Sequence, residues 1–123
     1  PIIPHPERNR EIRENPDLLY RLVDAGAISQ VTAGSITGYY GSEVEKFSLQ
    51  LFKHHLSHVI ASDAHGVNRR KPVLSEAYDR LRKTLGRECE DSCLTNAEGI
   101  VNHEAIQLPT PSKIRRKKLF GWI

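Results

Sequence analysis

Hydrophobic residues recur at helical spacing in three stretches of the chain. The first predicts a helix over residues 16–25 that starts at Asn15-Pro16, because Asn caps free amides and Pro lacks the donor that would go unused. The second predicts a helix over residues 43–54 and the third a helix from Pro72 to Gly86, and a shorter helix is expected over residues 96–101. The apolar positions of the three stripes are Leu18, Leu19, Leu22, Val23, Val44, Phe47, Leu51, Leu74, Ala77, Tyr78, Leu81 and Leu85.

Short apolar or β-branched runs alternate with these helices. Residues 1–4, 27–32 and 58–61 are predicted strands, and residues 33–35 are predicted to be a loop. This alternation predicts an α/β fold with a parallel sheet, and three such units make about half of a (β/α) barrel. Because a half-barrel leaves open sheet edges, we expect a missing amino-terminal half, or a second copy of the chain, to complete it.

Periodicity is lost after residue 106, so we expect one domain over residues 1–106 and an extended basic tail with an apolar end over residues 107–123. The last eleven residues carry five cations and no acid, and subtracting these five from the net charge of +3 leaves −2 on the rest of the chain. A mildly acidic body does not favour nucleic-acid binding, and membrane contact is expected only through the tail, if at all.

The composition is that of an ordinary soluble domain, with 38% hydrophobic and 27% charged residues among 123. No apolar run is long enough to span a membrane and no secretion signal is recognisable, so we expect a cytoplasmic protein. The chain begins at Pro1, inside a predicted strand, which indicates an excerpt. Cys89 and Cys93 are expected to be reduced thiols, because no second pair completes a zinc site.

Polar side chains directly follow two of the predicted strands. His5 follows the first, and Asp63 and His65 follow the third at a spacing that places both on one side of an extended segment. Parallel α/β folds bear their active sites at this edge of the sheet. A carboxylate and two imidazoles suit a divalent transition ion such as Mn, Fe or Zn. Each residue taken alone is more often an ordinary loop residue than a ligand.

The other histidines lack this context and are interpreted as structural or surface residues: His54, His55, His58 and His103.

Arginines flank the same two segments. Arg8 lies three residues after His5, and Arg69 and Arg70 follow His65. Guanidinium groups bind phosphate in a bidentate manner, so phosphoester chemistry is a natural use of this arrangement, although solvated surface charges are the ordinary alternative.

The strings His5-Pro6-Glu7-Arg8-Asn9, Gly26 through Ser35, and Ala61-Ser62-Asp63-Ala64-His65 closely resemble, in order and spacing, the carboxy-terminal half of the capsule-type protein tyrosine phosphatases of bacteria. This CpsB/CapC/YwqE family lies within the polymerase-and-histidinol-phosphatase (PHP) superfamily. The tail from Lys113 to Ile123 most resembles the YwqE branch of Bacillus.

The resemblance implies a distorted PHP-type (β/α) barrel of about twice this length, with a manganese-dependent centre of two or three ions. By position, His5, Asp63 and His65 match metal ligands, and Arg8 and Arg70 match phosphate-binding arginines, with Arg69 as the alternative to Arg70. The implied reaction is hydrolysis of phosphotyrosine on a bacterial tyrosine kinase that controls capsule or exopolysaccharide synthesis, by metal-activated water and without a cysteine nucleophile. Because the remaining ligands belong to the other half, the isolated chain is expected to be inactive and to hold few or no ions.

Two alternatives remain open at this point. A PHP-type histidinol-phosphatase or nuclease-like phosphoesterase would use the same metal pocket. A non-catalytic binding module would instead dock through its polybasic tail.

Overall fold

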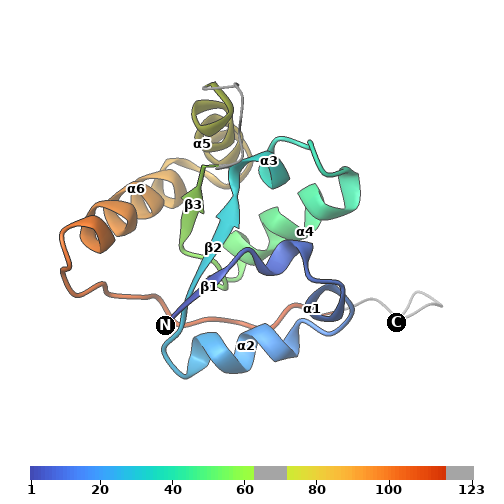
Figure 1. Cartoon of the computed structure of the whole chain (residues 1–123), viewed down its shortest axis with the longest axis horizontal. Coiled ribbons are helices and arrows are strands. Elements are labelled where there is room, and N and C mark those ends of the chain that lie inside the picture. Colours follow the sequence, from blue (N-terminus) through green and yellow to red (C-terminus); the bar gives the residue numbers. More distant parts are fainter. Residues whose placement is uncertain (63–71, 116–123) are drawn as a thin grey trace.

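Three short parallel strands form the centre of the molecule (Figure 1). The computed structural model describes residues 1–62 and 72–115. Strands β1 (Ile2–Pro4), β2 (Ile28–Thr32) and β3 (Val59–Ala61) lie in the order β1-β2-β3, with Ile3 opposite Ser29 and Val31 opposite Ile60. The predicted α/β class and parallel sheet are therefore confirmed, whereas closure into a PHP-type barrel remains a prediction.

The helices connect and cover these strands. The helical elements are η1 (Pro6–Arg8), α1 (Arg10–Glu14), α2 (Asp17–Asp24), α3 (Ala33–Ile36), α4 (Ser42–Lys53), α5 (Pro72–Leu85) and α6 (Arg87–Val101). The predicted helices over residues 16–25, 43–54 and 72–86 correspond to α2, α4 and α5. Helices α5 and α6 pack against β3 and each other, whereas α1 and α2 lie toward the opposite end of the molecule from α5 (Figure 1).

Three local predictions were wrong. The predicted helix over residues 96–101 is the end of α6, but its start is wrong. Helix α6 begins at Arg87, directly after Gly86, whose φ of 103° ends α5 and allows a new helix to start at once. Residues 33–35 lie in the short helix α3 instead of a loop, and all four α3 residues are buried. Asn15 does not cap α2 with its side chain; its backbone carbonyl accepts from Leu18 N at 3.1 Å instead.

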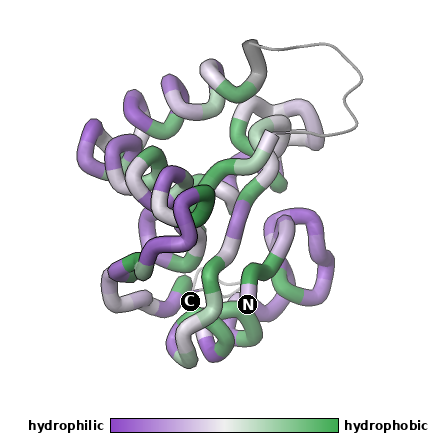
Figure 2. The backbone as a smooth tube through the Cα atoms, turned by 60° about the vertical axis from the view of Figure 1, so that its left-hand side comes forward, coloured by the Kyte–Doolittle hydropathy of each residue, from purple (hydrophilic) through white to green (hydrophobic). Residues whose placement is uncertain are grey.

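The core lies between the sheet and the inner faces of the helices. Hydrophobic and hydrophilic segments alternate along the helices in Figure 2, as expected when one face of each is buried. The largest fully buried side chains of this core are Leu19, Ile36, Leu51, Leu56 and Leu81. This packing fixes the ends of the strands, and with them the residues that follow each strand.

The described segment after α6 has no regular secondary structure but contacts the domain. Ser112 N donates to the carbonyl of His54 at 2.9 Å, Ile114 packs against the core, and the Lys113 ammonium lies 5.4 Å from the Tyr20 ring centroid. Within the described ranges, no helix has the length and apolarity needed to cross a membrane. Cys89 and Cys93 are unbridged thiols, as predicted.

Candidate functional site

The three strands run in the same direction, so the residues that follow them lie at one edge of the sheet. Figure 1 shows β2 and β3 pointing to the same side of the molecule, and η1 follows the end of β1. His5 comes after β1, α3 after β2, and Ser62 after β3. This edge is the location at which parallel α/β folds bind their ligands.

His5 occupies a strained turn at this edge. Its backbone adopts φ 42° and ψ 76°, a left-handed conformation that costs free energy for a residue other than glycine. The turn is fixed because His5 N donates to the Gln30 carbonyl of β2 at 3.1 Å. The imidazole is exposed and has no hydrogen-bond partner among residues 1–62 and 72–115. His55 and His103 share this left-handed conformation, so the feature that singles out His5 is its place beside Arg8 at the sheet edge.

Glu7 anchors this turn to the neighbouring strand. The side chain is fully buried, and its Oε2 accepts from Thr32 N at 3.0 Å and from the Ser35 hydroxyl at 2.6 Å. Its backbone carbonyl accepts from Arg13 Nη1 at 2.9 Å. Oε1 is buried without a hydrogen-bond partner in the described part of the chain. A buried carboxylate that joins two strand ends positions the residues on either side of it, here His5 and Arg8.

Arg8 presents its charge at the same edge. Its side chain is exposed, and the guanidinium carbon lies 4.2 Å from the centroid of the Tyr40 ring. Because an aromatic ring carries no net charge, this cation–π contact holds the guanidinium without neutralising it. No carboxylate of the described residues forms an ion pair with Arg8.

A cavity of about 350 Å³ brings His5 and Arg8 to one surface. It is lined by Ile3, Pro4, His5, Pro6, Arg8, Asn9 and Ile12. Asn9 belongs to this wall and also caps α1, since its Oδ1 accepts from Ile12 N at 3.0 Å.

The remaining predicted site residues lie outside the described residues: Asp63, His65, Arg69 and Arg70. Their convergence with His5 and Arg8 therefore stays a prediction. Within the described ranges, no three His, Cys, Asp or Glu side chains are grouped so as to hold a metal ion. The structure thus brings together His5 and Arg8, two of the predicted residues.

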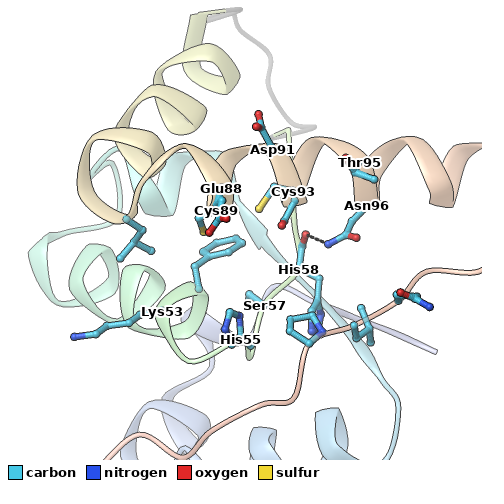
Figure 3. A pocket seen from close by; sticks show the side chains of 16 residues that line it. Lys53, His55, Ser57, His58, Glu88, Cys89, Asp91, Cys93, Thr95 and Asn96 are labelled. Carbon is cyan, nitrogen blue, oxygen red and sulfur yellow. Dashed lines mark hydrogen bonds between the residues drawn. The ribbon is translucent and has the colours of Figure 1, made fainter.

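A larger cavity of about 760 Å³ lies at the other end of the sheet, beside the start of β3 (Figure 3). His58 lines it and is 2% exposed; its Nδ1 accepts from Ser29 N at 3.0 Å, and its carbonyl accepts from Asn96 Nδ2 at 3.0 Å. Burial, and then the nearby His55, lower the pKa of His58 to about 4. His58 is therefore neutral near pH 7, in keeping with the structural role expected of it.

Sequence patterns missed Glu7 and Tyr40 at the candidate site, and Tyr39 next to Tyr40. Glu7 lies inside the motif that identified His5 and Arg8, but its partners are 25 and 28 residues away. The tyrosines are flanked by Gly38 and Gly41, which adopt φ values of 92° and 103°. The sequence offered one signal for them, namely two adjacent aromatic residues between two glycines.

Comparisons of the sequence with a family model and with curated proteins point to the same group of proteins. Residues 1–102 match the family described as "Capsular polysaccharide synthesis, CpsB/CapC". The chain is 47% identical over 122 residues to tyrosine-protein phosphatase YwqE of Bacillus subtilis, covering 99% of this chain and 48% of that protein. It is 26% identical over 112 residues to tyrosine-protein phosphatase CpsB of Streptococcus pneumoniae, covering 86% of this chain and 46% of that protein.

The fold of the chain also matches a solved structure from the same group of proteins. It comes from crystallographic work on YwqE and CpsB, described there as unique metal-dependent tyrosine phosphatases, and it superposes with a TM-score of 0.88 at 46% identity. The match covers 94% of this chain and 47% of the other. The chain thus spans about half the length of the curated relatives it matches.

Proposed function

Since the chain belongs to the CpsB/CapC family, we propose that it supplies part of the active site of a metal-dependent protein tyrosine phosphatase. The observation that carries this proposal is the pairing of His5 with Arg8 at the carboxyl edge of the sheet. Arg8 lies over Tyr40 with its charge uncompensated among the described residues, and His5 beside it offers an available imidazole. One residue suits a metal ion and the other suits a phosphoryl group.

His5, Asp63 and His65 are the residues that would hold the metal, which we propose to be manganese. His5 fits this role because its exposed imidazole lines a cavity together with Arg8 and has no described hydrogen-bond partner. Two imidazoles and a carboxylate are suitable donors for a divalent transition ion. When bound, such an ion lowers the pKa of a coordinated water and so supplies hydroxide at neutral pH.

Arg8 and Arg70, with Arg69 as the alternative to Arg70, would bind the phosphoryl oxygens of the substrate. A planar guanidinium donates two parallel hydrogen bonds to such oxygens and stabilises the negative charge that builds on them during transfer. Glu7 contributes indirectly: its buried carboxylate holds the His5–Arg8 turn against the end of β2. Cys89 and Cys93 take no part, since both line the cavity beside His58 and neither lines the one that His5 and Arg8 share. Cys93 is also 2% exposed, and hydrogen bonding to Cys89, together with burial, raises the pKa of its thiol.

The proposed substrate is phosphotyrosine on a bacterial tyrosine kinase that controls capsule or exopolysaccharide synthesis. The named activity of the relatives supports phosphotyrosine, and the family description supports the link to capsular polysaccharide. We also propose that a PHP-type barrel is completed by an amino-terminal half or by a second copy of the chain. The coverage of about half of each relative supports this arrangement.

The test is a substrate series with the complete gene product. Initial rates are measured with manganese on a phosphotyrosine peptide, histidinol phosphate and single-stranded DNA, before and after removal of metal by a chelator. We expect hydrolysis of the phosphotyrosine peptide, its loss on chelation and its recovery when manganese is restored. Preferential turnover of histidinol phosphate or DNA would contradict the proposal. Lack of any turnover, with vesicle binding that requires residues 113–123, would favour a non-catalytic docking module.

A further inference from the structure

An exposed tyrosine lies one aromatic ring away from the Arg8 guanidinium. Tyr39 is 74% exposed, and its ring packs edge-on against Tyr40 with centroids 5.0 Å apart and an interplanar angle of 89°. Tyr40 in turn lies under Arg8 at 4.2 Å. Arg8, Tyr40 and Tyr39 therefore form a continuous surface that changes from cationic to aromatic.

The backbone that bears Tyr39 is firmly placed, although its ring is exposed. Tyr39 N donates to the Gly34 carbonyl at 2.9 Å, and Gly41 N donates to the Gly38 carbonyl at 3.1 Å. A Cβ added at Gly38 would lie 3.2 Å from Glu45 Oε1, and Gly38 also needs its φ of 92°. The loop that carries Tyr39 is thus defined by close packing and hydrogen bonds, which leaves little backbone entropy to lose when a ligand binds.

The loop is also tied to the rest of the domain. Glu45, against which Gly38 packs, forms an ion pair with Arg80 of α5. Exposed tyrosines that stand singly on a surface need no explanation. This one is part of an anchored loop and adjoins an arginine whose charge is uncompensated among the described residues, which favours a binding role over a chance exposure.

We propose that Tyr39 is an aromatic subsite that holds the ring of an aryl phosphomonoester while Arg8 binds its phosphoryl group. This inference rests on the proposed phosphatase function. In phosphotyrosine a single ester oxygen separates the ring from the phosphorus, so a phosphoryl group at Arg8 leaves the substrate ring within reach of Tyr39. Edge-to-face or offset stacking of the two rings would then stabilise binding. Phosphoserine offers no ring, so Tyr39 distinguishes aryl from alkyl esters.

The test compares two substrates in one protein. The complete gene product and its Tyr39→Ala variant are assayed on a phosphotyrosine peptide and on the same peptide with phosphoserine. We expect Tyr39→Ala to lower kcat/KM for phosphotyrosine by about two- to tenfold, mainly through KM, because this is what an aromatic pair contributes. The rate on phosphoserine should not change. Tyr39→Phe should restore the phosphotyrosine value, because the ring and not the hydroxyl makes the contact.

Val101→Ala is the matched control, since Val101 is 75% exposed on α6 and lies outside the candidate site. Wild-type-like kcat/KM for phosphotyrosine in Tyr39→Ala would overturn the inference while leaving the phosphatase function intact. Equal losses on both peptides would also overturn it, because they would indicate a general disturbance of Arg8. If the wild-type protein were inactive on both peptides, the proposed phosphatase function would be contradicted, and the Tyr39 subsite with it.

Discussion

The two ends of the sheet use histidine in opposite ways. At the carboxyl edge, His5 is exposed, has a left-handed backbone and lines a cavity with an arginine. At the amino edge, His58 is buried, accepts a backbone hydrogen bond from Ser29 and has a pKa of about 4. The fold exposes His5 beside Arg8 and buries His58 as a neutral structural acceptor. Cavity size alone would not identify the candidate site, because the cavity lined by His58 is larger than the one lined by His5.

The largest expected effect is at the carboxyl edge. Arg8→Ala should lower kcat for a phosphotyrosine peptide by about 10²–10³-fold in the complete gene product, because it removes a donor aimed at the charge that develops in the transition state. Steady-state kinetics measure the effect. Arg10→Ala is the control, since Arg10 forms an exposed ion pair with Glu14 at 3.1 Å. A drop of the same size in Arg10→Ala would show that the charge acts at long range rather than at the site.

Arg70→Ala should lower turnover by roughly a hundredfold while leaving the bound metal unchanged, because an arginine that binds phosphoryl oxygens is not a metal ligand. Turnover and elemental analysis of the purified variant are measured together, with Arg69→Ala as the comparison. A parallel fall in metal content would assign Arg70 a structural role, and a greater loss in Arg69→Ala would exchange the two assignments.

Glu7→Ala should destabilise the protein by about 4 kcal/mol, because it leaves Thr32 N and the Ser35 hydroxyl buried without their acceptor and creates a cavity. Urea denaturation of the complete gene product measures the change. Glu7→Gln, which keeps one acceptor oxygen, should lose less stability. If Glu7→Ala unfolds at the wild-type urea concentration, the carboxylate does not anchor the turn.

At the amino edge, acid should destabilise the protein through His58. The folded-state pKa of about 4 lies below the ordinary value of 6.5, so between these values the unfolded chain binds more protons than the native one. Stability contributed by neutral His58 is therefore present above about pH 6.5 and is lost as pH falls toward 4, by up to about 3 kcal/mol. Protonation at Nδ1 would also remove the acceptor of Ser29 N.

Urea denaturation across this pH window tests the effect. The wild-type protein should lose stability as the pH falls, whereas His58→Gln should start less stable and show a flatter dependence. His103→Gln, which removes an exposed histidine, should keep the wild-type slope. An unchanged slope in His58→Gln would mean that other groups cause the acid sensitivity.

Local sequence patterns predicted the regular parts of this fold but not the contacts between distant segments. Helices α2, α4 and α5 have clear apolar stripes, and each lies where its stripe was found. Helix α6 was largely missed because its first two turns are rich in acidic residues and few of its side chains are buried. Helix α3 is only four residues long and wholly buried, so it shows no periodicity.

In the candidate site, too, some residues could be predicted from local sequence and others depend on contacts between distant segments. His5 and Arg8 were found because they directly follow a strand in a recognisable string. The role of Glu7 depends on Thr32 and Ser35, and the contact between Arg8 and Tyr40 joins residues more than thirty positions apart. Such pairings are created by the register of the sheet and by the packing of α3, so no local pattern specifies them.

The most direct test of the central claim is anomalous diffraction from crystals of the complete gene product grown with manganese. We predict a manganese peak within coordination distance of His5, Asp63 and His65, with Arg8 beside it. A peak at the His58 cavity instead, or a fully occupied ion that His5 does not contact, would contradict the account.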